Sequence, residues 1–324
     1  MVGNILAWLV LVLVTVGLGW LAVRAFRSRN GLVKWLGGGL SGLMTVLLGL
    51  VSVVALVGWV KLYAPGGHPV SAVQVARTPE QIARGEKFAQ FCAACHSPTG
   101  QPPLAGGMDN FGHFPGGPTI GTLYPPNLTP AGELAEWSDG EVIRAIREGI
   151  GRDGQSLIIM PSETFRYLSD ADVQAIVAYL RSQPASGDVR PENDLNLLGA
   201  VFIGAGLFPT SAQPAITRPI TAPPQGPTAD YGLYLISVSG CRVCHGPSLT
   251  GGAGPGPAGP NLAALVPHWT EAQFINTIRT GIDPSGHELA AKEMPWRQLS
   301  AEFSDNELRA IYLVLHNLGP ATAP

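Results

Sequence analysis

The chain has 324 residues, only 13% of which are charged, and its mean hydropathy is +0.20. This composition is too apolar for an ordinary soluble protein and indicates membrane spans. No Asp or Glu precedes Glu80, whereas residues 64–324 carry 15 basic and 23 acidic residues, a formal charge of −8. That balance excludes a basic nucleic-acid-binding face. The acidic surface is either simply solvated or attractive to a basic protein.

Residues 1–63 are predicted to form a transmembrane helical hairpin anchored in membrane lipid. Two uncharged stretches, 4–23 and 35–60, are each long enough to span a bilayer, which takes about 20 residues. The positive segment "RAFRSRNGLVK" between them is expected to stay in the cytoplasm, which places everything after Lys61 on the outer side of the cytoplasmic membrane. A cleaved signal peptide needs a positive start, which "MVGNILAW" lacks. Neither stretch has a His or an acidic residue, so we expect an anchor without its own haem or proton relay.

The rest of the chain contains one module twice. The four cysteines form two matched clusters, "CAACH" at 92–96 and "CRVCH" at 241–245. After each cluster the same signals recur in the same order, namely Pro-Asn-Leu, a Trp-led helical segment that ends in Gly-Ile, Met-Pro and a last helix that begins at Ser-Asp. We expect a linker over 64–78, a first module over 79–184, a Pro-rich linker with an apolar segment over 185–228 and a second module over 229–320.

Each module is predicted to be mostly helical. The first helix of module 1 has Thr78 as N-cap, Pro79 at its first position and Gln81 placed to complete a capping box. Ser138, Ser169 and Ser304 are predicted N-caps of later helices, and the last helix of each module has an apolar face. A long Gly- and Pro-rich loop follows each cysteine cluster, as expected where a large apolar cofactor packs inside the loop.

The cysteine clusters could hold zinc, a redox disulfide or haem. Zinc usually requires two Cys or His pairs close in sequence, and each cluster has only one. A thioredoxin-like redox site accompanies a βαβ pattern, which is missing from this helical sequence. Covalent haem attachment by C-x-x-C-H fits both copies, with Cys92 and Cys95, then Cys241 and Cys244, bound to the porphyrin. The sequence therefore predicts two haem c groups, with His96 and His245 as iron ligands.

Met160 and Met294 are the predicted second iron ligands, because both precede a proline at matching points of the repeat. A methionine opposite histidine raises the potential of a haem. Met108 lies too near His96 in sequence and is interpreted as a loop residue against the haem edge. Three other histidines do not recur between the copies and are expected at the surface or in contact with a haem propionate, namely His113, His268 and His287. Pro126 and Pro260 are expected to present a carbonyl to the ring N–H of the histidine ligand.

At this point the chain resembles a known family. Each module looks like a class I cytochrome c domain, and "NLTP…WSDGEVIRAIREGIGRDG…MP…LSDADVQAIVAYLRSQP" is similar to the multihaem cytochrome subunits of membrane-bound alcohol, gluconate and aldehyde dehydrogenases. The resemblance covers about 79–320. It implies two tandem class I cytochrome c domains, so with the N-terminal two-helix hairpin predicted above we expect a mainly α chain. It also implies haem binding by the cysteines, histidines and methionines named above.

The apolar run "LNLLGAVFIGAGLF", 195–208, is too short to span a bilayer. It could pack between domains, lie on the membrane surface or contact a partner, and a buried contact between domains or subunits is favoured because an exposed run of this kind promotes aggregation.

The leading hypothesis for function is electron transfer without catalysis. A membrane-anchored pair of haems would pass electrons between a respiratory or photosynthetic membrane complex and a soluble cytochrome c, copper protein or oxidase. The cytochrome subunit of a periplasmic dehydrogenase is the alternative, set second because those subunits generally carry three haems and are commonly tethered at the other end. A dihaem peroxidase is a weaker alternative, since it needs an iron with an open position and both modules retain a methionine.

Overall fold

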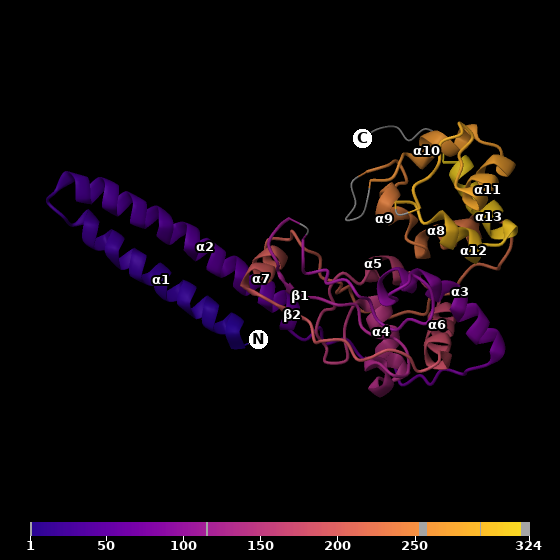
Figure 1. Ribbon diagram of the computed structural model, residues 1–324, viewed down its shortest axis with the longest axis horizontal. Helices are drawn as coiled ribbons and strands as arrows, with labels where there is room; N and C mark the ends of the chain where they lie inside the picture. Colours follow the sequence, from indigo (N-terminus) through magenta and orange to yellow (C-terminus); the bar gives the residue numbers. More distant parts are fainter. Residues whose placement is uncertain (1, 115, 253–257, 292, 319–324) are drawn as a thin grey trace.

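The computed structural model describes residues 2–114, 116–252, 258–291 and 293–318. It is an elongated molecule in which the helical hairpin, the first module and the second module follow one another in space (Figure 1). Helices dominate all three parts, and the one sheet among the described residues consists of two very short strands.

The hairpin consists of α1 (Val2–Phe26) and α2 (Gly38–Tyr63), and a π-helical turn, η1 (Val33–Gly37), leads into α2. Both helices are long and apolar enough to cross a membrane. Large apolar side chains stay exposed along both of them, as expected for lipid-facing helices. The start of α1 and the end of α2 lie beside the first module, and the turn that contains Arg27 and Arg29 lies at the far end (Figure 1).

The first module is built from four helices, a 3-10 turn and a strand pair. The elements are α3 (Pro79–His96), β1 (Gly121–Thr122), η2 (Glu133–Glu136), α4 (Asp139–Glu148), α5 (Ser162–Phe165), α6 (Asp170–Ser182) and β2 (Asp194–Leu195). Strands β1 and β2 are antiparallel, with Gly121 opposite Leu195.

The second module repeats this order. It contains α8 (Ala229–Val238), α9 (Cys241–His245), α10 (Leu262–Leu265), η3 (Val266–His268), α11 (Glu271–Thr280), α12 (Trp296–Glu302) and α13 (Asp305–His316). In this module α8 ends at Val238 and α9 begins after the left-handed Gly240, whereas α3 runs unbroken through its cysteine cluster.

The first and last helices of each module cross at a glycine. A Cβ on Gly85 of α3 would lie 1.8 Å from the carbonyl oxygen of Ala175 in α6, and a Cβ on Gly232 of α8 would lie 1.9 Å from that of Ala310 in α13. Only glycine permits this approach of two backbones. The same contact at matched positions shows that the two modules share one fold.

The predicted caps are present with one exception. Ser138 and Ser304 close capping boxes with Glu141 and Glu307, and Ser169 accepts from the backbone of Asp172. Thr78 caps α3 by accepting from the backbone N–H of Gln81. The predicted capping box at Gln81 is wrong, because its buried side-chain oxygen has no hydrogen-bond partner and therefore does not return to the cap.

The apolar run of the linker forms α7 (Leu197–Gly204), which packs against α2. A Cβ on Gly58 of α2 would meet the Ala200 carbonyl, and a Cβ on Gly204 would meet the Val54 carbonyl. Figure 1 shows α7 beside the C-terminal end of α2, where the hairpin meets the first module. The favoured buried contact between domains is thus found between the hairpin and the first module, and not between the two repeated modules.

Candidate functional site

The first cysteine cluster occupies the C-terminal end of α3. Nδ1 of His96 lies 2.9 Å from the carbonyl oxygen of Pro126. Because a carbonyl only accepts, Nδ1 donates and the Nε2 lone pair is left available as a metal ligand. Burial lowers the pKa of His96, and the bond to Pro126 opposes this only in part, so the ring is neutral, as a ligand requires.

The second cluster has the same arrangement although α9 is a separate turn of helix. Nδ1 of His245 lies 2.9 Å from the carbonyl oxygen of Pro260. The preceding Gly259 is required here, since a Cβ at that position would lie 2.7 Å from Nδ1 of His245. In both modules the carbonyl of the cluster histidine accepts from a glycine N–H at 2.9 Å, from Gly106 in the first and Gly251 in the second.

The four thiols are free, without a disulfide, and Cys92 and Cys241 pack against the apolar core. Burial raises the pKa of Cys92 to about 12, with further contributions from Cys95 and Glu302, and burial raises that of Cys241 to about 11. Such surroundings suit neutral thiols or thioethers and disfavour the thiolates that zinc binds. Among the described residues no group of three or more His, Cys, Asp or Glu side chains could hold a metal ion.

Met160 and Met294 lie in the loops before α5 and α12. Both are partly buried and pack against the apolar core that Cys92 and Cys241 also contact. Both predicted methionines therefore contact the single apolar core that runs through the two modules. Met108 is 63% exposed and accepts from Arg190 at 3.7 Å. The three histidines expected at the surface, His113, His268 and His287, are all exposed.

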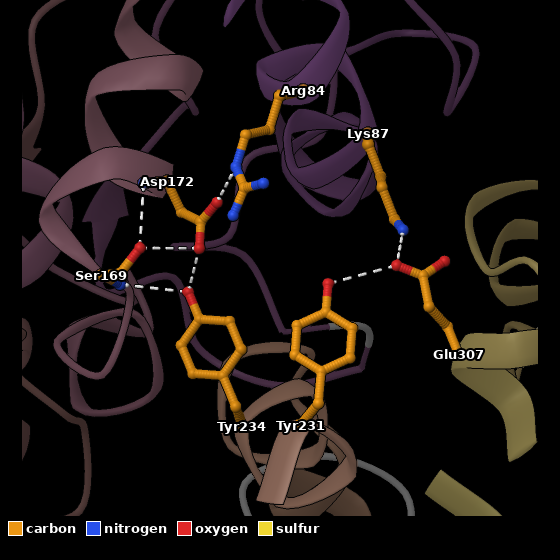
Figure 2. Close-up of polar contacts among 7 residues, drawn as sticks. All are labelled: Arg84, Lys87, Ser169, Asp172, Tyr231, Tyr234 and Glu307. Atoms are coloured by element: carbon orange, nitrogen blue, oxygen red, sulfur yellow. Dashed lines mark hydrogen bonds and ion pairs between the residues drawn. The ribbon is translucent and has the colours of Figure 1, made fainter. Parts of the chain in front are cut away.

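The two modules meet through a pseudo-twofold interface, drawn in Figure 2. Lys87 of α3 reaches across to Glu307 of α13, and Tyr234 of α8 reaches across to Asp172 of α6. Lys87 and Tyr234 both stand two residues after the crossing glycine of their module, and Asp172 and Glu307 both stand three residues after the capping serine. The same position on the first helix of one module therefore contacts the same position on the last helix of the other, in both directions, as in a symmetric dimer.

Each of these acidic residues has a second donor from a first helix. Asp172 accepts from Arg84, and Glu307 accepts from Tyr231 at 3.3 Å. Asp172 is fully buried and additionally accepts from Ser169 at 2.7 Å. A buried carboxylate with this many donors is satisfied, so the cluster fixes the orientation of the two modules.

Apolar contacts beside the polar cluster make the two cores continuous. The ring centroids of Phe91 and Phe303 lie 6.3 Å apart across the interface. An apolar crevice beside Cys92 is lined by first-module residues such as Phe88 and by Val238 of the second module. Buried residues of both modules form one hydrophobic cluster.

Sequence analysis missed the interface residues, including Asp172, Tyr234 and Glu302. Glu302 ends α12 and lies at this boundary, with both carboxylate oxygens buried and without a hydrogen-bond partner. The available signal was the acidic residue at the third position of both last helices, which was interpreted only as part of a helix start.

Comparison with known proteins agrees with this architecture. The family model for cytochrome c matches residues 82–184, and the model for subunit III of cbb3-type cytochrome c oxidase matches residues 232–313. These ranges lie within the predicted modules.

Several curated proteins are similar to the chain. One subunit of the nicotinate dehydrogenase of Pseudomonas putida is 31% identical over 310 residues, which is 88% of this chain and 25% of that protein. The gluconate 2-dehydrogenase cytochrome c subunit of Pantoea cypripedii is 30% identical over 51% of this chain and 38% of its own length. The cytochrome c subunit of the quinone alcohol dehydrogenase of Gluconacetobacter polyoxogenes is 28% identical over 55% of this chain and 39% of its own. The chain therefore spans a quarter to two fifths of the length of these relatives.

Haem c, the cofactor of the matched domains, fits the residues of both sites. Each site offers two cysteine thiols and a histidine with its Nε2 lone pair available, and both predicted methionines contact the apolar core that the two modules share. Two such domains correspond to two haem c groups.

Proposed function

We propose that this chain, in which family models for cytochrome c domains match residues 82–184 and 232–313 and which has two apolar N-terminal helices, is the electron-transfer subunit of a membrane-bound dehydrogenase complex. It would accept electrons from a catalytic subunit and deliver them to a soluble carrier. The relatives that are cytochrome subunits of gluconate and alcohol dehydrogenases support this proposal. They favour the dehydrogenase alternative over the respiratory or photosynthetic complex that the sequence placed first.

The residue roles follow from the two clusters. Cys92 and Cys95, then Cys241 and Cys244, would attach the porphyrins, and His96 and His245 would bind iron through Nε2 while Pro126 and Pro260 hold their rings. Met160 and Met294 would be the second iron ligands. When bound, haem c supplies a one-electron couple, whose potential is raised by methionine. The surrounding apolar core excludes water and ligands, so each site is suited to carry electrons rather than to activate a substrate.

The observation that carries the proposal is the continuous core between the two modules. The Phe91–Phe303 contact and the hydrogen bond from Tyr234 to Asp172 hold the two modules against each other. A fixed arrangement allows transfer inside one molecule and does not require collisions between molecules.

The hairpin supports an outer location for both haem domains. Its positive turn is at the end far from the modules (Figure 1), and positive loops face the cytoplasm. We propose that the domains occupy the periplasmic side of the cytoplasmic membrane, where haem c is attached.

Mild detergent extraction followed by identification of the co-purifying proteins tests the partnership. A large dehydrogenase subunit is expected, and recovery with only quinol-oxidising or photosynthetic proteins would contradict the proposed partnership.

Optical spectra of the same sample test the carrier role. Both oxidised haems should give a methionine–iron charge-transfer band, whereas a high-spin haem that binds cyanide readily would favour a peroxidase. Met160→Ala and Met294→Ala should each remove one band.

A further inference from the structure

The methionine loops of the two domains share one backbone geometry. Leu157 donates to the Gly149 carbonyl and Leu289 to the Gly281 carbonyl, both at 2.7 Å. Each loop also has an isolated antiparallel bridge seven residues after the glycine, formed with the isoleucine that follows that glycine. Because the backbones match, the two loops can be compared position by position.

The loop of the first domain is covered by other parts of the chain. The segment that leaves the hairpin bonds to it through Gly66 N–H and Gly154 O at 2.8 Å. The linker bonds to it through Ser211 N–H and Leu157 O, also at 2.8 Å, and through a bridge between Thr210 and Ile158. As a result Ile150 is only 2% exposed.

The same loop in the second domain is open. Ile282, the counterpart of Ile150, is 41% exposed. Within the described part of the chain, no segment from outside the second domain makes a backbone hydrogen bond to residues 281–291. The apolar side chain of Ile282 is thus exposed to solvent, on the loop that leads to Met294. We call it the apolar centre of this loop.

The open loop also carries carboxylates at positions where the covered loop has none. Asp283 and Glu288 stand where the first domain has Gly151 and Ser156, and Glu293 lies in the longer stretch before the methionine. Asp283 is held by its own loop, with Ser285 and the His287 N–H donating to it. Glu288 and Glu293 are exposed and form no ion pair among the described residues.

We propose that the methionine loop of the second domain, residues 281–291 together with Glu293 and Met294, is the docking surface for a small basic one-electron carrier protein. The inference deepens and rests on the proposed function above. A modest apolar centre with a charged rim is typical of transient redox encounters, which need rapid release. The carboxylates accelerate encounter with a basic partner and select against an acidic one. Because the corresponding loop of the first domain is covered, we assign the haem of the first domain to the electron donor.

The test measures electron exchange between the full chain in detergent and a lysine-rich soluble cytochrome c by stopped-flow spectroscopy. The comparison variant is Asp283→Asn/Glu288→Gln/Glu293→Gln. The control variant, Asp153→Asn/Glu163→Gln/Glu192→Gln, removes the same charge from exposed positions of the first domain and its linker. Low ionic strength, where the Debye length is ~30 Å, is compared with ~0.1 M salt, where it is ~10 Å.

The loop variant should lose about tenfold in the second-order rate at low ionic strength and lose most of its salt dependence, while the control variant stays near the unmodified chain. Cytochrome c with succinylated lysines should react slowly with the unmodified chain, the loop variant and the control variant. Ile282→Ser should slow exchange at both salt concentrations. An equal rate for the loop variant and the unmodified chain, or equal losses in both triple variants, would overturn the proposal. Such a result would leave the haem spectra and internal transfer unchanged, so the proposed function would stand.

Discussion

At the scale of single residues, Glu302 is an acid in surroundings that oppose its charge. Both of its oxygens are buried without a hydrogen-bond donor, and Lys87 nearby is already paired with Glu307. Desolvation raises its pKa from 4.5 to about 8, and Lys87 offsets this only in part. Glu302 is therefore protonated in the folded protein at neutral pH, although it would be ionised in the unfolded chain.

This pKa predicts a specific pH dependence of stability. The folded state binds the proton of Glu302 more tightly than the unfolded state does. The resulting contribution to folding stability is complete below the unfolded pKa near 4.5 and is lost as pH rises through the folded pKa of about 8. We expect Glu302→Gln to stabilise the full chain by roughly 2–5 kcal/mol at pH 9 relative to its effect at pH 5. Thermal unfolding at both pH values measures this. Glu293→Gln, at an exposed site, is the control, and equal behaviour of the two variants would contradict the assignment.

At the scale of elements, the crossing glycines decide whether each domain can close. Gly85 and Gly232 bring the first helix against the backbone of the last, and the cysteine cluster forms the end of α3 in the first domain and is separated from α8 by two residues in the second. The position of each haem site therefore depends on a contact between two backbones rather than on side chains alone.

Gly85→Ala and Gly232→Ala should each destabilise only their own domain. The added methyl group forces the helices apart at a site where backbone cannot yield, at a cost of about 1–3 kcal/mol or more. Covalent haem content per chain, measured by pyridine haemochrome assay, should fall from two toward one in either variant and toward zero in the double variant. Gly39→Ala, where nothing lies within 4 Å, should retain both haems. Full haem content in the single variants, with unchanged stability, would refute this role.

Helix α7 couples the first haem domain to the hairpin. Its contacts with α2 are backbone to backbone at Gly58 and Gly204, so side-chain bulk at either position must separate them. In Gly204→Val we expect faster hydrogen exchange of the amides of α7 with unchanged exchange in α3 and α6. Gly17→Val, in an open part of α1, serves as control. Unchanged protection of α7 would show that its docking on α2 is not needed.

At the scale of the whole molecule, the repeat and the haem motifs were predictable because they are local in sequence. Cysteine spacing, capping serines and paired methionines each follow from a few neighbouring residues. The relation between domains was not predictable in this way. Asp172, Tyr234 and Lys87 lie far apart in the chain, and their pairing depends on how two folded surfaces meet. The linker segments that cover Ile150 are likewise extended, irregular chain without a periodic signal.

The shared interface implies that the two haem domains exchange electrons directly, inside one molecule. Rapid partial reduction of the purified full chain, with Met294→His used to distinguish the second haem by its spectrum, measures this exchange. We predict that electrons redistribute between the two haems with a first-order rate that does not change with protein concentration. A rate that rises in proportion to protein concentration, or no redistribution, would contradict direct exchange across the interface.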